Sequence, residues 1–270
     1  MSAKTLEMHG AGATWFRHPQ RSTASAAEGD GLPTDDPEAM SGTVTVAVTE
    51  GLGRFWLTAQ LDTLREAFPQ IDVRLDCSMS LADVRHMPSG VAVQIADVSD
   101  PELRRIKLAR IHTMPFAAQR YVEALGIPQA LNDVSGHRLV LQMAEQTATR
   151  ELFSMVMADV PTSDVVVVRS GGSSSHYRMI ADGEGIGFLP TYLFAVGEPL
   201  VPIDMNLHFP FDVWLVCGAD ATRIPRVQRT IDWLIQSFDP LRFPWFRDHF
   251  IHPRELLSEY NGPPIPRLAS

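Results

Sequence analysis

Small polar residues follow several apolar segments of this chain, and the first group is Thr49, Glu50, Gly51 and Leu52. An alternating apolar segment precedes the group, and an amphipathic helical pattern follows it over 53–68. The free N–H groups and the dipole at the start of such a helix favour an anion. The group therefore predicts a ligand cradle, although a simple helix N-cap at Thr49 is an equally good interpretation. Because Glu50 would repel an anion, we expect its side chain to face solvent or a cation.

A second group, Ser170, Gly171, Gly172 and Ser173, follows the continuous valine run at 165–168. Glycine permits a close backbone approach, and hydroxyl and N–H groups donate to anions. The alternative is a flexible loop that ends in a helix N-cap. The position of the group at the carboxyl end of a predicted strand favours ligand binding.

Further hydroxyl, thioether and amide side chains stand at the ends of other predicted strands. They are Ser78, Met79, Ser80, Gln94, Gln142, Gln146 and Thr147. Helix capping and solvent exposure are the simpler roles of such residues. The candidates are mostly neutral hydrogen-bonding groups, which suit ligand binding better than acid–base catalysis. We therefore predict a binding protein that is not an enzyme and has no catalytic residues.

Sequence motifs for nucleotides, metals and nucleophilic catalysis are absent. The chain has no P-loop and no HExxH, and GEGIGF at 183–188 predicts a helix end and a tight turn. His249 and His252 lack a third ligand for zinc. His176, beside the serine-rich segment, lacks an orienting carboxylate for a nucleophile pair. We expect no cofactor and no metal.

The composition excludes some classes of protein. Among 270 residues, 32 Asp and Glu against 23 Lys and Arg give a net charge of −9, which repels a phosphate backbone. Cys77 and Cys217 are far apart in the sequence, and we predict two buried strand thiols. No stretch has the roughly 18 apolar residues of a membrane span, and the first residues lack a secretory signal. We expect a cytoplasmic protein.

Strand and helix patterns alternate from residue 43 to about 235, which is typical of an α/β fold with parallel sheets. The predicted strands are 43–49, 71–77, 91–95, 139–142, 164–169, 186–189 and 212–217. The predicted helices are 53–68, 80–87, 117–125, 147–157, 173–182 and 225–238. The strands form two clusters that separate near 112–116, so we expect two hinged lobes. We assign about 43–112 and 212–240 to lobe I, about 113–211 to lobe II, 1–42 to a disordered or loosely attached segment, and 241–270 to a tail that packs on the domain.

Several segments, in their order and spacing, resemble the effector-binding domain of LysR-type transcriptional regulators. They are GTVTVAVTEGLGRFWL, ADVSDPELRRIKLARI, SGHRLVL, SSSHYRMIADGEGIGFLPTYL and FDVWLVCGADATRIPRVQRTIDWL, and they spread over about 41–240. The resemblance implies two Rossmann-like lobes joined by two crossover strands, as in type 2 periplasmic-binding-protein-like folds. It also implies that the chain senses a small polar or anionic metabolite and regulates transcription through ligand-dependent changes of its oligomeric state.

Members of that family carry an N-terminal winged helix-turn-helix, which residues 1–42 do not resemble. We therefore expect only indirect contact with nucleic acid, in a homodimer or in a mixed oligomer with full-length relatives. By analogy with the family, Phe55 and Trp56 form an exposed edge against a partner, and the alternative is that both belong to the core. The alternative functions are a solute-binding receptor of the same fold, an enzyme on that fold, and an intact DNA-binding regulator.

Overall fold

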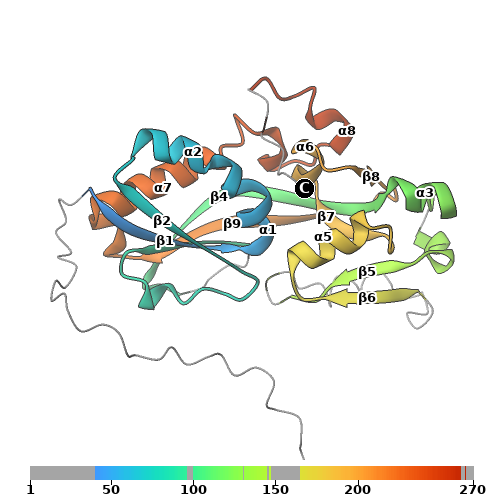
Figure 1. Cartoon of the computed structure of the whole chain (residues 1–270), viewed down its shortest axis with the longest axis horizontal. Helices are drawn as coiled ribbons and strands as arrows, with labels where there is room; N and C mark the ends of the chain where they lie inside the picture. Colours follow the sequence, from blue (N-terminus) through green and yellow to red (C-terminus); the bar gives the residue numbers. More distant parts are fainter. Residues whose placement is uncertain are drawn as a thin grey trace, which may run out of the picture. The chain divides into compact units, whose positions relative to one another are not determined.

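The computed structural model describes residues 40–95, 100–129, 131–144, 146, 165–262 and 265. The strands are β1 (Gly42–Thr49), β2 (Ile71–Ser78), β3 (Gly90–Gln94), β4 (Leu103–Ala118), β5 (Leu139–Gln142), β6 (Val166–Ser170), β7 (Gly187–Pro190), β8 (Leu200–Pro202) and β9 (Phe209–Gly218). The helices are α1 (Glu50–Leu52), α2 (Thr58–Ala67), α3 (Gln119–Leu125), α5 (Ser173–Ala181), α6 (Tyr192–Ala195), α7 (Pro225–Ser237) and α8 (Pro253–Leu256). Strands β2, β1, β3, β9, β4 and β7 follow one another in a single sheet, with β8 also paired to β4 (Figure 1).

The first lobe is built around β1, in which Val44, Val46 and Val48 are buried. Such β-branched side chains suit a pleated, covered surface. Strand β1 pairs in parallel with β2 and with β3, and β9 pairs with β3 in the antiparallel direction. Helix α1, a π-helical turn (Gly53–Leu57) and α2 follow β1 as one helical stretch, and α2 contacts α7.

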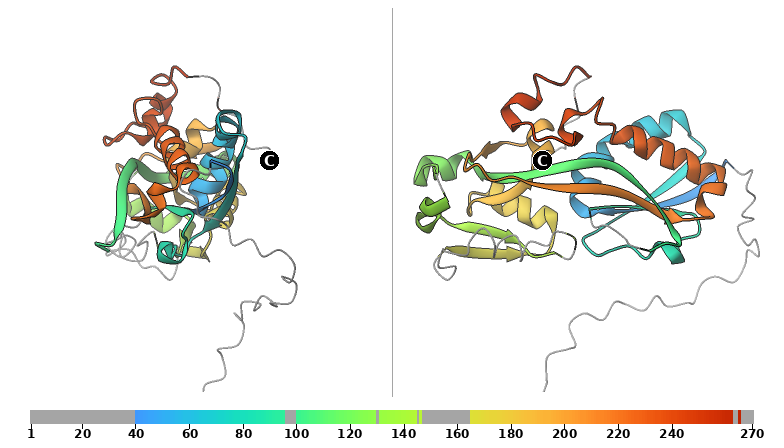
Figure 2. Two further views of the ribbon diagram at one scale, coloured as in Figure 1. Left: turned by 90° about the vertical axis from the view of Figure 1, so that its left-hand side faces the viewer. Right: turned by 180° about the vertical axis from the view of Figure 1, so that it is seen from behind.

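Strands β4 and β9 are the two crossovers between the lobes (Figure 2). They pair with each other from Leu103 opposite Gly218 to Thr113 opposite Phe209, with a bulge at Leu108. At its far end β4 pairs with β7 and β8, while β5 and β6 form a second, parallel pair that a bridge from Leu139 to Ile186 joins to the β7 segment. The predicted fold of two lobes with two crossovers is confirmed. The large sheet is mixed rather than purely parallel, because both crossover strands run against their neighbours.

One long strand was not predicted, and one predicted helix is absent. Residues 103–118 form the strand β4, for which the sequence pattern predicts no element before 117; the predicted helix 117–125 is present as α3, which begins two residues later. Residues 80–87 form no α-helix and contain only a 3₁₀ turn, Val84–His86. Val84 is the one buried side chain of that turn, which gives a helix too little apolar surface to pack. The predicted helix 147–157 lies outside the described residues.

The C-terminal segment covers the helical stretch that follows β1. Phe55 and Trp56 are buried, so they do not form the exposed edge considered for a dimer. The indole N–H of Trp56 donates to the backbone oxygen of Ser237 at 2.9 Å. Its ring packs edge-on against Phe243 and Phe246, at centroid distances of 4.7 and 5.0 Å. The rings of Phe243 and Phe246 thus cover a surface of this helical stretch that would be exposed without the C-terminal segment.

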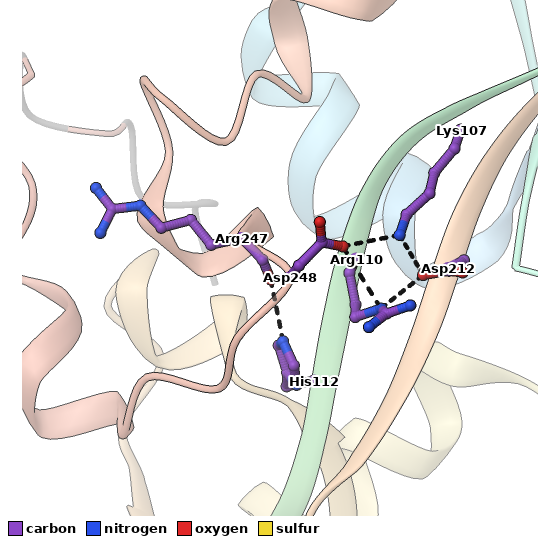
Figure 3. A network of polar contacts seen from close by, with 6 residues as sticks. All are labelled: Lys107, Arg110, His112, Asp212, Arg247 and Asp248. Carbon is purple, nitrogen blue, oxygen red and sulfur yellow. Dashed lines mark hydrogen bonds and ion pairs between the residues drawn. The ribbon is translucent and has the colours of Figure 1, made fainter.

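A polar network ties the same C-terminal segment to the crossover strands (Figure 3). The Lys107 ammonium on β4 lies 2.7 Å from the Asp248 carboxylate and 3.0 Å from that of Asp212 on β9. The Arg110 guanidinium also pairs with Asp212, at 2.6 Å. These bonds, chiefly the one from Arg110, hold the pKa of Asp212 below its ordinary value. Nearby, the Nε2 atom of His112 lies 3.1 Å from the backbone oxygen of Arg247.

The thiols differ from each other in exposure. Cys217 on β9 is buried as predicted, but Cys77 is exposed, because β2 is the edge of the sheet and its last residues face solvent. Within the described ranges, every helix is too short or too polar to cross a bilayer. The same ranges hold no cluster of three or more His, Cys, Asp or Glu side chains that could bind a metal ion.

Candidate functional site

The two predicted anion cradles meet each other, and the carboxylate of Glu50 lies between them. The backbone N–H groups of Ser173 and Ser174, at the start of α5, donate to this carboxylate at 2.7 and 3.2 Å. The expectation that Glu50 faces solvent or a cation is therefore wrong. The start of α5 is the favourable partner, because its free N–H groups and its dipole attract a negative charge.

Gln146 fastens the same edge of the first lobe to the second. The hydroxyl of Thr49 donates to Oε1 of Gln146 at 2.7 Å, and the amide of Gln146 donates to the backbone oxygen of Ser80 at 3.1 Å. The backbone N–H of Ile95 also points to Oε1, at 3.4 Å. Thr49 stands at the N-cap of α1, but its side chain makes no capping bond. Its hydroxyl is used between the lobes instead.

A third contact joins Met79 to the second lobe. The amide of Gln142 donates to the hydroxyl of Ser173 at 3.0 Å, and this hydroxyl lies 3.1 Å from the sulfur of Met79. Gly51 suits this contact, because a Cβ atom on it would lie 3.2 Å from the Cβ and the hydroxyl of Ser173, which is closer than an ordinary contact. The lobes therefore touch at the predicted residues.

The remaining candidates do not all converge. Ser170 is buried, and its hydroxyl donates to the backbone oxygen of Gly172 at 3.1 Å within its own loop. The hydroxyl of Ser78 accepts from the backbone N–H of Ser80 at 3.0 Å. Gln94 is buried at the end of β3. Thr147 lies outside the described residues.

Two cavities lie along this contact, and Thr49 lines both of them. The more polar one has a volume of about 160 Å³ and opens at the carboxyl ends of β1, β2 and β3. Its polar lining consists of Thr49, Asp76, Ser78, Ser80, Gln94 and Gln146. Five of these six residues are among the candidates that the sequence predicts.

The second cavity has a volume of about 60 Å³ and is mainly apolar. Aromatic rings come to it from both lobes and from a crossover strand; they belong to Phe55, Tyr177, Phe188, Tyr192 and Phe211. This cavity is not predictable from the residue pattern alone, because buried aromatic residues of helices and strands are indistinguishable from ordinary core. One signal was available, since His176 stands three residues after Ser173 and so on the same helix face.

His176 is the buried titratable group of this second cavity. Its side chain is 2% exposed, and Nε2 lies 3.0 Å from the backbone oxygen of Phe188, to which it donates. Burial lowers the pKa of His176 to about 4, so the ring is neutral at pH 7. In the described part of the chain, Nδ1 has no hydrogen-bond partner. A neutral ring that donates from Nε2 leaves Nδ1 as an acceptor.

Comparisons with known proteins agree on one family. The family model described as LysR substrate binding domain matches residues 37–239. The probable HTH-type transcriptional regulator LtrA of Klebsiella pneumoniae is 22% identical over 253 residues, which cover 89% of this chain and 80% of that protein. The HTH-type transcriptional regulator DmlR of Escherichia coli is 24% identical over 213 residues, or 76% of this chain and 68% of that one.

Solved structures show a similar fold. The regulatory domain of CrgA, a LysR-type transcriptional regulator from Neisseria meningitidis, superposes with a TM-score of 0.61 at 17% identity over 73% of this chain and 99% of that chain. The full-length virulence activator AphB of Vibrio cholerae gives a TM-score of 0.58 at 16% identity, over 74% of this chain and 69% of that one.

Proposed function

The chain belongs to the LysR substrate-binding-domain family, and from this premise we propose that its two lobes sense a small-molecule effector for transcriptional control. Its relatives are transcriptional regulators and not enzymes. The effector would bind between the lobes and change their relative position, and this change would be transmitted to the oligomeric state. An effector has this effect only if it binds one arrangement of the lobes more tightly than another.

The observation that supports this proposal best is the contact between Thr49 and Gln146. Each residue comes from a different lobe, both are buried, and both line the polar cavity. A ligand in that cavity would replace or extend hydrogen bonds that already join the lobes. We therefore expect an effector in this cavity to alter the fit of one lobe to the other.

A small polar metabolite suits the polar cavity, whose volume of about 160 Å³ is lined by hydroxyl and amide groups together with one carboxylate and several aliphatic side chains. An anionic metabolite is the less favourable form of this proposal. It would face Asp76 in the lining, and it would compete with Glu50 for the N–H groups of α5. We propose a cytoplasmic location and a homodimer or mixed oligomer, with nucleic acid contacted through a partner, because the relatives act on transcription.

A thermal-shift screen of organic acids, amino acids and sugars tests the proposal, since a ligand that binds only the folded chain raises its melting temperature. The variant Thr49→Val removes the hydroxyl at nearly constant shape. Thr43→Val removes a hydroxyl that bonds Asp72 on the exposed end of the sheet, and is the matched control. A compound that stabilises wild type and Thr43→Val, but not Thr49→Val, is the expected result.

Gel filtration with light scattering then shows whether the same compound changes the oligomeric state. Failure of every compound to stabilise the chain would count against effector sensing. Equal stabilisation of Thr49→Val and wild type would place the effector away from the polar cavity. A compound that stabilises the chain and leaves its oligomeric state unchanged would remove the proposed route to transcription.

A further inference from the structure

The apolar cavity is a second candidate site, and its walls come from elements that are far apart in the sequence. Leu52 and Phe55 come from the helical stretch after β1, Tyr177 from α5 and Phe211 from β9. The rings of Phe55 and Tyr177 meet edge-on across the lobe boundary, at a centroid distance of 5.0 Å. Walls of this kind suit an apolar or aromatic group, because rings favour edge-to-face and offset contacts with other rings.

One residue of the wall, His176, carries a polar atom that has no hydrogen-bond partner in the described part of the chain. Nδ1 of His176 is buried and without a hydrogen-bond partner among the described residues, although Nε2 is held by Phe188. A buried acceptor that lacks a donor is destabilising in an isolated domain. A ligand that brings an O–H or N–H group to this atom would satisfy it. A carboxylate would not, since it offers only acceptors.

The negative charge of Glu50, beside the cavity, also disfavours a carboxylate ligand. Ser173 lines the cavity, and its backbone N–H is already bonded to the carboxylate of Glu50 at 2.7 Å. The favourable place for a ligand anion, at the start of α5, is thus filled by the chain's own negative group. A second carboxylate brought next to Ser173 would be repelled by Glu50, and the N–H groups of Ser173 and Ser174 are already bonded.

We propose that this cavity binds an uncharged molecule, or part of one, that has a ring-sized apolar body and a hydroxyl or amine donor directed at Nδ1 of His176. The proposal rests on the proposed effector-sensing function and names a class of effector for it. Glu50 is then a specificity residue, because it excludes carboxylates. The volume of about 60 Å³ is smaller than the roughly 150 Å³ of a cavity known to accept benzene, so the lobes must part slightly to admit a ring.

Three probes of similar shape test the chemistry on the whole chain. Phenol has a ring and a donor, toluene has a ring without a donor, and benzoate has a ring with a negative charge. Calorimetric titration of wild type should give the highest affinity for phenol, about tenfold weaker binding of toluene, and no measurable binding of benzoate. Equal affinities for phenol and toluene, or benzoate as the preferred probe, would overturn the proposal.

Two substitutions of one residue separate the roles of the two ring nitrogens. His176→Gln places a donor near the position of Nε2 and removes the acceptor at Nδ1, whereas His176→Asn keeps an acceptor near Nδ1 and loses the donor. We expect His176→Gln to reduce the affinity for phenol about tenfold and to leave that for toluene unchanged. We expect His176→Asn to keep its preference for phenol. If instead His176→Asn lost the preference for phenol and His176→Gln kept it, the preference would depend on the contact with Phe188, and the role of Nδ1 would be overturned.

Glu50→Gln tests the exclusion of anions. Because this variant also loosens the contact between the lobes, its affinity for phenol should rise too, but the affinity for benzoate should rise more and become measurable. A rise for benzoate no larger than that for phenol would remove Glu50 as the specificity residue. If none of the three probes binds wild type but a polar compound from the screen does, effector sensing stands and the ring-sized class of effector is wrong. If neither the probes nor the screened compounds bind, both proposals fail.

Discussion

Glu50→Gln should loosen the contact between the lobes, and the structure gives the size of the effect. The carboxylate of Glu50 accepts from Ser173 and Ser174 at 2.7 and 3.2 Å. A hydrogen bond to a charged group contributes about 1.5–3 kcal/mol, but both N–H groups are only half-buried, so water partly replaces a lost bond. The amide of glutamine still accepts one bond. We therefore expect the free energy of unfolding to fall by about 2 kcal/mol.

Urea unfolding at pH 7 measures this difference, and a fall of about 4–8 °C in melting temperature should accompany it. Glu66→Gln is the matched control, because Glu66 is exposed on α2, and its effect should stay within about 0.5 kcal/mol. If Glu50→Gln unfolds like this control, the carboxylate does not hold the lobes together, and the proposed role of Glu50 at the start of α5 is refuted.

Four other outcomes follow from burial and charge. Trp56→Ala should cost about 3–5 kcal/mol in urea unfolding, because the ring is fully buried; a cost below 1 kcal/mol would contradict its place in the core. Asp248→Asn should lower the free energy of unfolding by less than about 1 kcal/mol, since 74% of that side chain is exposed beside Lys107. Removal of 240–270 should leave a chain that no longer unfolds cooperatively. The fold keeps His176 neutral while the unfolded chain binds a proton below pH 6.5. The free energy of unfolding should therefore fall as pH drops from 6.5 to about 4, by up to about 3 kcal/mol, and His176→Gln should lose that dependence.

The elements that the sequence predicts well are those whose apolar side chains repeat with a clear period. Strand β1 alternates valines, and α7 carries its buried residues on one face after Pro225. Strand β4 was missed at its first half because four consecutive residues there, from Arg104 to Lys107, are exposed. Pairing with β9, more than 100 residues later in the chain, makes this segment a strand, and no local pattern reports such a partner.

The residues of the site likewise divide into those that a local pattern predicts and those that only the fold brings together. The positions of Thr49, Ser80 and Gln146 at strand ends are readable from the sequence, because parallel strands bring their carboxyl ends to one edge. The role of Glu50 is not readable, since its partners at the start of α5 lie 123 and 124 residues away. Local chemistry predicts repulsion of an anion there, and only the fold shows that Glu50 itself supplies the anion.

The paired crossover strands determine what kind of motion this protein can make. Because β4 and β9 stay hydrogen-bonded to each other from Leu103 to Thr113, no slack linker separates one half from the other. A change in the angle between the halves must therefore twist this two-stranded ribbon. The bulge at Leu108 interrupts the ladder, so we expect the ribbon to bend there first.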